Sequence, residues 1–232
     1  MDFSLDKAMN FLYIIFVLLV SLSVHESAHA YIAEKRGDFT GRILGRITLN
    51  PLKHLDPVGS IIVPILLFLF NLPVFGWAKP VPVNPRNFKN IRMDNALVSA
   101  AGPLSNLMLS AIAVLAMAFY MVIVGPSSFY SQFEDPYSLP QLLLIFSSIN
   151  LLLMVFNILP IYPLDGSHIF EAVLPSGAAL SAYEKIKPYG FLILLFLIMT
   201  PILGIVLTAL LNFSVKFFVF FPLSLLSQLL GK

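Results

Sequence analysis

Residues 25–29 are His-Glu-Ser-Ala-His, and they lie inside a stretch of sequence that is otherwise apolar. Two histidines four residues apart on a helix point the same way, which suits two ligands of one zinc ion, and Glu26 stands where a general base would act. The preceding residues, Phe11 to Val24, include no charged side chain. Ionisable groups at membrane depth normally face a protein interior or a wet cavity, so the first hypothesis is a zinc hydrolase site inside a bilayer. A polar cluster that only packs helices together is the weaker alternative.

The composition is that of a protein that crosses a membrane several times. Of its 232 residues, 58% are hydrophobic and 11% charged, whereas a soluble domain carries about 25% charged residues. The mean hydropathy is +0.89. We expect a single integral-membrane domain over residues 1–232, with a catalytic core at about 11–175 and C-terminal helices at about 188–232. The net charge of +2 indicates no partner, and because cysteine is absent, a metal must be held by histidine and carboxylate.

Apolar runs predict the elements that position the two histidines. Membrane helices are expected at about residues 11–33, 95–124, 139–159 and 189–211. Residues 217–230 are too short for a firm assignment. Residues 41–50 show a weak alternation of apolar and polar side chains, bounded by glycine at one end and Asn-Pro at the other, which predicts a short strand or hairpin. Residues 61–70 are too few to span a membrane, which predicts a re-entrant segment. The expected fold is an all-α polytopic membrane protein with about five to six membrane helices and a short β-hairpin or re-entrant element after the first helix.

The distribution of basic residues predicts how the chain crosses the membrane. Segments 35–56 and 73–94 are basic and should face the cytosol, whereas the loop 125–140 has no lysine or arginine and should lie outside. The first helix then runs inwards and ends near the histidines, and the helix at 139–159 returns, bringing residues 160–166 to the same depth. We therefore expect a multi-pass protein of the cell membrane, with its active site in the cytosolic half of the bilayer.

Asp165 is the candidate for a third metal ligand. Pro160 and Pro163 should stop the preceding helix, which makes Leu164–Gly166 irregular backbone, tolerated near a membrane only where it is buried in protein or lines a cavity. Asp165 is the one carboxylate in this segment. Two histidines and a carboxylate leave a fourth tetrahedral position for water, the catalytic arrangement of zinc. Asp-Gly is also a common turn pair, but the nearby histidines favour the ligand interpretation.

Five sequences, taken together, resemble the site-2 protease family of intramembrane zinc metalloproteases. They are HESAHA at 25–30, NPLKHLDPVG at 50–59, GWAKPVPVNP at 76–85, AGPLSN at 101–106 and NILPIYPLDG at 157–166. Each one is weak alone, but their order on membrane helices, over about two-thirds of the chain, makes the resemblance specific. The chain is most similar to the compact prokaryotic branch, which lacks PDZ and CBS domains.

The resemblance implies an activity and a cofactor. It implies a zinc-dependent intramembrane endopeptidase that hydrolyses peptide bonds within or near transmembrane segments. One zinc ion per chain is expected on His25, His29 and Asp165, with Glu26 as the catalytic acid/base. The expected partners are a transmembrane protein substrate and the lipid bilayer, and no nucleic acid is expected. After Gly166 the sequence has Ser-His, where family members often show Gly or Ser followed by Arg, so no role is assigned to His168.

Four further residues are candidates for contact with substrate. The resemblance implies Asn157 and Pro163, while Asn106 and His54 are weaker candidates for donors to the oxyanion. Helix packing is the alternative for the two asparagines, and a surface position is the alternative for His54. A substrate helix must unwind before attack, and we expect it to pair as an added strand with residues 41–50 or 73–94.

A membrane ion or metal transporter is the competing function. Buried histidine, glutamate and aspartate side chains can form an ion path. The sequence disfavours this alternative because it shows no internal repeat of the kind that many transporters carry. Its expected metal ligands also converge at one depth instead of stepping across the bilayer.

Overall fold

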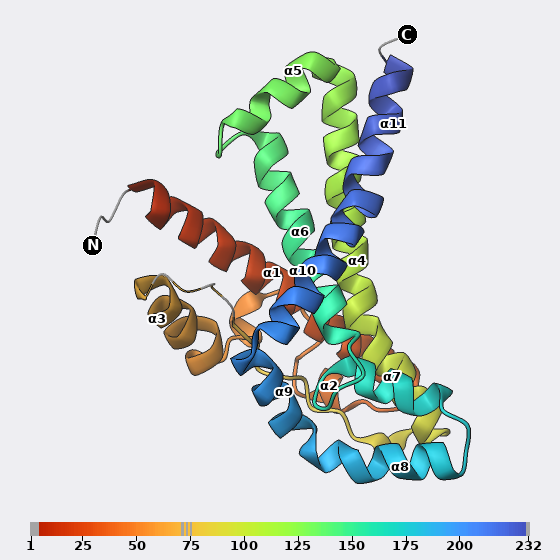
Figure 1. Cartoon of the computed structure of the whole chain (residues 1–232). Helices are drawn as coiled ribbons and strands as arrows, with labels where there is room; N and C mark the ends of the chain where they lie inside the picture. The colour runs from red at the N-terminus through yellow and green to blue at the C-terminus, as the bar shows by residue number, and fades with distance from the viewer. Residues whose placement is uncertain (1–4, 71, 73, 75, 231–232) are drawn as a thin grey trace. The chain divides into compact units, whose positions relative to one another are not determined.

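The computed structural model of the chain describes residues 5–70, 72, 74 and 76–230. These residues form helices and irregular segments, and none of them lies in a β-strand (Figure 1). They divide into two compact units. Unit 1 comprises Met1–Ser105 and His168–Val173, and unit 2 comprises Asn106–Ser167 and Leu174–Lys232. Unit 1 thus holds the two histidines of the sequence motif.

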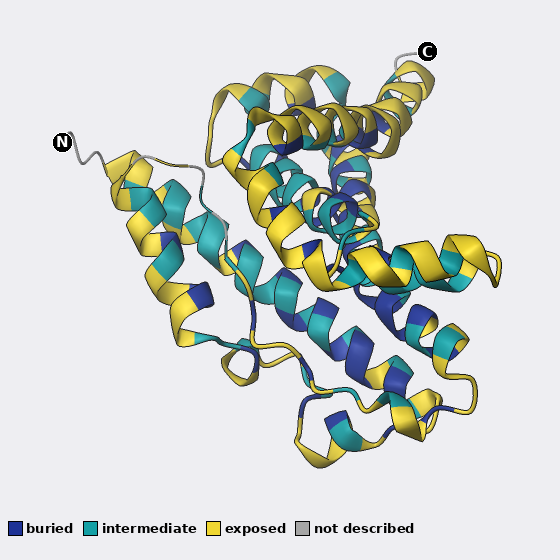
Figure 2. Cartoon of the chain, turned by 60° about the horizontal axis from the view of Figure 1, so that its bottom comes forward, coloured by how far each residue is buried: buried dark blue, intermediate teal, exposed yellow. Residues whose placement is uncertain are grey.

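Unit 1 is built on one long helix. Its elements are α1 (Leu5–Lys35), α2 (Thr40–Ile43), η1 (Pro51–Lys53), η2 (Pro57–Ile62), α3 (Val63–Leu69), η3 (Pro85–Asn87) and the first part of α4 (Ile91–Val124). Helix α3 lies beside the first half of α1, where the rings of Phe11 and Phe68 stack with their centroids 4.3 Å apart (Figure 1). Figure 2 shows that the buried residues of α1 gather in its second half, which contains both histidines.

Three short turns of unit 1 begin with the same pair of residue types. Each of η1, η2 and η3 starts at a proline that follows Asn50, Asp56 or Asn84. In each case the asparagine or aspartate side chain accepts a hydrogen bond from a backbone N–H of the turn that follows. The side chain satisfies an otherwise orphaned donor while proline presets the backbone angle of the first position. Asx-Pro pairs therefore explain how the long connection between α1 and α4 is ordered.

Asp38, just after α1, ties this connection to the end of the helix. The residue is fully buried. Its carboxylate accepts hydrogen bonds from the Asn84 amide, the Asn87 side chain and the Thr40 hydroxyl. Burial by itself would raise the pKa of Asp38, but these hydrogen bonds outweigh it and lower the pKa below its usual range. The ionised carboxylate is therefore part of the folded structure.

Unit 2 is a second group of helices. It contains the rest of α4, α5 (Pro126–Ser131), η4 (Gln132–Glu134), α6 (Leu139–Asn157), α8 (Ala178–Ile186), η5 (Lys187–Tyr189), α9 (Gly190–Met199), α10 (Pro201–Val215), η6 (Lys216–Phe220) and α11 (Phe221–Leu230). Helix α7 (Asp165–Val173) begins in unit 2, and its last six residues belong to unit 1. The main core of unit 2 consists of Val114, Met117, Met121, Phe129, Leu151, Val219 and Leu223.

Four helical stretches of the described chain are long and apolar enough to cross a membrane. They are α1, α4, α6 and the continuous stretch Pro201–Leu230. The chain is thus an all-helical, multi-pass membrane protein, as its composition predicts. The sequence predicts about five to six membrane helices, and the described residues contain four stretches that are long and apolar enough. The segment Pro57–Leu69 is a shorter apolar helix, below the roughly 20 residues that a crossing needs, and its re-entrant course stays a prediction.

The predicted hairpin at 41–50 is wrong. Residues Thr40–Ile43 form helix α2 instead, and Gly41 packs so closely on α1 that a β-carbon there would lie 2.9 Å from the β-carbon of Ala30. The Ser27 hydroxyl on α1 exchanges hydrogen bonds with the backbone N–H and C=O of Thr48. An isolated two-stranded hairpin is marginal in water, so packing on α1 satisfies this backbone better than strand pairing.

The end of the chain also differs from its expected form. The helix expected at 189–211 is broken, because α9 ends at Met199 and α10 begins at Pro201. Proline has no N–H to donate within a helix but fits the first position of a new one. Residues 217–230, left open from the sequence, continue α10 through a π-helical turn just before Pro222. The resulting stretch Pro201–Leu230 has 30 residues.

Candidate metal centre

Helix α1 places His25 and His29 one turn apart on the same face. Their ring centroids are 4.6 Å apart, and the rings are nearly perpendicular, at 86°. Both residues are buried, with exposed fractions of 4% and 9%. The predicted spacing is therefore realised as a pair of neighbouring imidazoles that are shielded from solvent.

A backbone carbonyl fixes the protonation of His29. Its Nδ1 atom lies 2.7 Å from the carbonyl oxygen of Val98 in α4. A carbonyl can only accept a hydrogen bond, so Nδ1 carries the proton and donates it. The lone pair of a neutral imidazole then resides on Nε2, the atom left to bind a metal. Hydrogen bonds of this kind orient metal-binding histidines and raise their basicity as ligands.

A missing side chain leaves room for an ion between the two histidines. A β-carbon built on Gly102 of α4 would lie 2.5 Å from Nε2 of His25 and 2.5 Å from Nε2 of His29. Both Nε2 atoms therefore border one small space, which stays open because residue 102 is glycine. Zinc binds histidine nitrogen at about 2.0–2.1 Å. The donor types, their convergence on one point and the space beside Gly102 together fit a zinc ion.

Glu26 is held by the main chain of the segment before α4. Its Oε2 atom accepts a hydrogen bond of 2.7 Å from the backbone N–H of Val81. The amides of Trp77 and Lys79 donate in turn to the carbonyls of Gly59 and His54. Amides of alternate residues that point to one side are typical of an extended strand. One edge of the extended segment 77–81 is thus hydrogen-bonded to other residues of unit 1, and the last of these bonds reaches the carboxylate of Glu26, the predicted general base.

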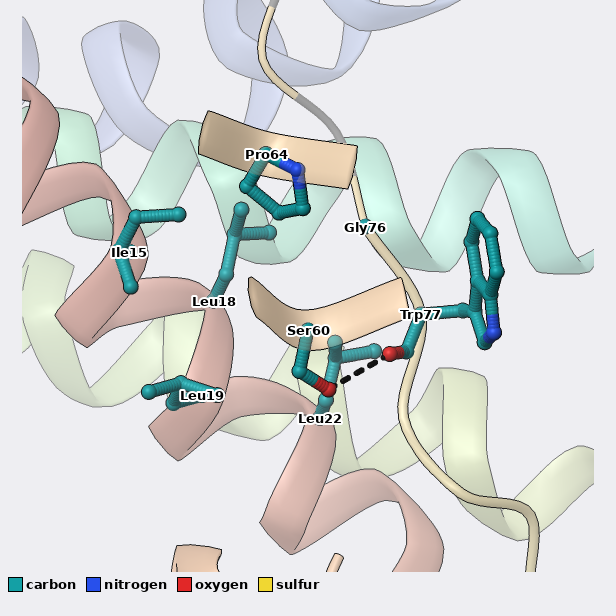
Figure 3. Close-up of a pocket in the computed structure, with 8 residues that line it drawn as sticks. All are labelled: Ile15, Leu18, Leu19, Leu22, Ser60, Pro64, Gly76 and Trp77. Carbon is teal, nitrogen blue, oxygen red and sulfur yellow. Dashed lines mark hydrogen bonds between the residues drawn. The ribbon is translucent and has the colours of Figure 1, made fainter. Parts of the chain in front are cut away.

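A small apolar pocket lies where this extended segment begins. Its lining comes from Ile15, Leu18, Leu19 and Leu22 of α1 and from Ser60, Pro64, Gly76 and Trp77 (Figure 3). The Ser60 hydroxyl donates to the Trp77 carbonyl over 2.8 Å, and the indole of Trp77 packs so tightly on Gly59 that no β-carbon would fit there. These contacts anchor the segment one to three turns before His25 and so fix the direction in which it runs towards Glu26.

Asp165 does not lie on irregular backbone, as its sequence context predicts, but is the first residue of α7. The irregular segment comprises residues 158–164 and ends one residue before Asp165. Gly166 explains the tight turn: a β-carbon there would clash with the carbonyl oxygens of Ile158 and Leu159 at the end of α6. Helix α6 ends at Asn157, three residues before Pro160, and α7 begins two residues after Pro163. Asp165 belongs to unit 2, and its role as third ligand stays a prediction.

The two asparagines named as substrate contacts make hydrogen bonds within unit 2. The side-chain amide of Asn157 donates to the Leu153 carbonyl one turn earlier in α6, over 3.0 Å. The buried Asn106 donates to the side chain of Asn150 over 2.9 Å and so links α4 to α6. The bond between Asn106 and Asn150 is of the kind expected of helix packing in a membrane, whereas the bond of Asn157 stays within α6. The roles of both residues towards substrate stay predictions.

His54 and Pro163 occupy different surroundings. His54 is 2% exposed, so it is no surface histidine, and its Nε2 donates to the Thr48 carbonyl over 2.9 Å. It joins the loop that packs on α1 to the segment that carries Val81. Pro163 is exposed in the turn before α7. Their contacts with substrate also stay predictions.

Sequence reasoning missed the partners that orient the site. The carbonyl of Val98 and the amide of Val81 are main-chain atoms, and no residue type at either position would announce them. Gly102 carried a detectable signal, because it belongs to the matched sequence AGPLSN. A glycine within a membrane helix is ordinarily interpreted as a helix-packing residue, but a β-carbon at residue 102 would lie against the Nε2 atoms of both histidines.

Comparison with known proteins places the chain in a family. The profile of Peptidase family M50 matches residues 69–201, a range that includes Asp165 and begins after the two histidines. The candidate zinc metalloprotease YwhC of Bacillus subtilis is 42% identical over 202 residues, which cover 86% of each chain. The candidate zinc metalloprotease Rip2 of Mycolicibacterium smegmatis is 31% identical over 196 residues, or 84% of this chain and 69% of that protein.

A third relative is the candidate zinc metalloprotease Rip2 of Mycobacterium tuberculosis, 29% identical over 187 residues, or 80% of this chain and 66% of that protein. No solved structure matches the chain significantly. The chain belongs to peptidase family M50. The predicted membership among site-2 proteases and the predicted class of enzyme, a hydrolase of peptide bonds, are therefore confirmed.

Proposed function

We propose that this chain is a zinc-dependent endopeptidase that cleaves membrane proteins within or near their transmembrane segments. The observation that carries the proposal is the space beside Gly102, on which the Nε2 atoms of His25 and His29 converge. Two further facts support it: the glutamate of the same helix turn is oriented by a backbone amide, and the relatives are named as zinc metalloproteases. The site lies on helices that can cross a membrane.

Asp165 supplies the third ligand in this proposal. Two histidines and a carboxylate form a set that leaves one position for water. Asp165 is the one carboxylate of its segment, and a carboxylate is the ligand type that a chain without cysteine can add to two histidines.

The residues divide the work of peptide hydrolysis. Bound zinc lowers the pKa of a water ligand towards about 7 and polarises the carbonyl to be attacked. Because Oε2 of Glu26 is held by the Val81 amide, the other carboxylate oxygen is the one placed to take the proton of the water. Glu26 later gives this proton to the leaving amine, so that the base becomes the acid of the second step.

The extended segment 77–82 limits how substrate can pair with it. The edge formed by residues 77, 79 and 81 already donates its N–H groups to Gly59, His54 and Glu26. The opposite edge carries Ala78, Pro80 and Pro82, and proline has no N–H. That edge offers carbonyl acceptors at every position but a donor only at Ala78. An unwound substrate lying there donates its own N–H groups, a one-sided form of strand addition.

The location and organisation of the protein complete the proposal. The basic segments 35–56 and 73–94 support a site in the cytosolic half of the cell membrane. Residues 1–232 act as one integral-membrane domain in this proposal. The partners are the bilayer and a protein substrate with a transmembrane segment.

The test uses the purified full-length chain in detergent with a transmembrane protein as substrate. Wild type should cleave it in a zinc-dependent manner, and Glu26→Gln should keep the zinc but lose the cleavage. Metal flux through liposomes that persists in Glu26→Gln, without any cleavage by wild type, would instead support the transporter alternative. Pairing with substrate is tested separately, by replacing single N–H groups of the substrate with esters.

A further inference from the structure

A charged side chain holds the end of α7. Arg92 in α4 donates from Nε and from Nη2 to the backbone carbonyl of Glu171, at 2.9 and 2.5 Å. Glu171 lies in the last turn of α7, where backbone carbonyls have no partner within the helix. A cation at this end also opposes the partial negative charge of the helix dipole. All of these residues belong to unit 1.

A second contact lies one turn away. The side-chain amide of Asn95 in α4 is 2.9 Å from Nδ1 of His168 in α7. The amide nitrogen can only donate, so Nδ1 of His168 accepts and the ring proton is on Nε2. Arg92 and Asn95 are three residues apart on α4, and Glu171 and His168 are three residues apart on α7. The two helices are therefore antiparallel here, and each advances by three residues from one contact to the next.

The same face of α4 continues to the metal centre. Residues 92, 95, 98 and 102 are spaced by three or four, so they form one stripe along the helix. Val98 orients His29 through its carbonyl, and Gly102 leaves the space between the imidazoles. Asp165 is the first residue of α7, three residues before His168. A single helix face thus sets the positions of the histidines and the register of α7.

We propose that Arg92, Asn95 and His168 form a clamp that positions Asp165 for zinc. These are positioning residues, since they act on the metal through α7 and contact neither the ion nor the substrate. The proposal rests on the ligand set of the proposed function, in which Asp165 is the third ligand. It gives His168, which has no assigned role from the sequence, a place in the site. Without the clamp α7 is free to shift, and the carboxylate no longer stays at the ligand position.

Zinc affinity of the full-length chain, measured by competition with a chelator, tests the clamp directly. Arg92→Gln and Asn95→Ala should each weaken zinc binding about 10- to 100-fold, the range seen for residues that orient metal ligands. Arg92→Lys keeps one charged donor and should recover part of the loss. Arg86→Gln is the control, because Arg86 is also an arginine of unit 1 but is exposed, whereas Arg92 is half-buried, and this variant should bind zinc like wild type.

A double variant separates positioning from general damage to the fold. In an Asp165→Ala background, Arg92→Gln should cause no further loss of zinc affinity, because the clamp acts only through that carboxylate. Equal losses in both backgrounds would mean general damage and overturn the clamp. Wild-type affinity in both Arg92→Gln and Asn95→Ala, with Asp165→Ala impaired, would overturn the clamp alone. Wild-type affinity in Asp165→Ala would overturn the ligand set as well. Helical content and a single peak in size-exclusion chromatography show that each variant is folded.

Discussion

Gly102→Ala is the sharpest test of the metal centre. The added methyl carbon would lie 2.5 Å from Nε2 of both histidines, a distance that real β-carbons do not show and close to the 2.0–2.1 Å of a zinc–nitrogen bond. The methyl group and the ion cannot share this space. Helix propensity works the other way, because alanine is favoured over glycine by about 1 kcal/mol in a helix. The variant should therefore fold and yet lose its metal.

The expected loss of zinc affinity is at least about 100-fold, or about 2.8 kcal/mol at about 1.4 kcal/mol for each factor of ten. Elemental analysis after dialysis should give about one zinc per chain in wild type and close to none in Gly102→Ala, and cleavage of a transmembrane substrate should fall in parallel. Gly204→Ala is the matched control: this glycine lies inside α10, and a β-carbon there meets no atom within 4 Å. It should keep its zinc and its activity.

A Gly102→Ala variant that binds zinc within about threefold of wild type would refute the reasoning. Retained metal would mean that the ion does not occupy the space next to residue 102, or that α4 can move away at little cost. Zinc loss in the Gly204→Ala control as well would point to general instability. Only loss confined to residue 102 supports the geometry.

Three further predictions concern the groups around the metal. Glu26→Gln should keep one zinc per chain but lower the cleavage rate about 10²- to 10⁴-fold, the usual contribution of a general acid or base; equal loss of zinc would show that Glu26 serves as a ligand instead. Val81→Pro removes the N–H that holds Glu26 and should lower kcat about 10- to 100-fold, the value of one charge-assisted hydrogen bond of about 1.5–3 kcal/mol, whereas Val81→Ala keeps the N–H and should stay near wild type. Asp38→Asn should lower the Tm at neutral pH. The pKa of Asp38 is lowered in the folded protein, so the ionised carboxylate stabilises the fold fully above the ordinary aspartate pKa of about 3.9. This stabilisation is lost as the pH falls through the pKa of the folded protein. The difference in Tm between wild type and Asp38→Asn should therefore shrink below about pH 4, and a difference that stays constant from pH 7 to pH 3 would contradict the role of the ionised carboxylate.

The histidine pair was predictable because helical geometry depends only on spacing. Residues four apart on a helix share a face, so the apolar run around His25 and His29 was enough to place both rings together. Asp165 is the candidate for the third ligand because its segment holds no other carboxylate, and that role stays a prediction. Its backbone was harder to predict, because proline signals the end of one helix and says little about how soon the next one starts.

What the sequence did not reveal depends on main-chain atoms and on competition between contacts. The Val98 carbonyl and the Val81 amide would be present whatever their side chains. The weak alternation of residues 41–50 favours strand pairing, but the backbone N–H and C=O of Thr48 form hydrogen bonds with the Ser27 hydroxyl instead. Pro201 carries a signal for a break in the helix expected at 189–211, but the apolar run continues on both sides of it.

Trp77 packs on Gly59 at the start of the segment that leads to Glu26, and it is the only tryptophan in the chain. Intrinsic fluorescence therefore reports from a single known place, with no label and no background from other indoles. The fluorescence emission of Trp77 should therefore change when metal or a substrate chain binds, and it can be followed in real time. Trp77 is an intrinsic fluorescent probe four residues before Val81, whose amide holds Glu26.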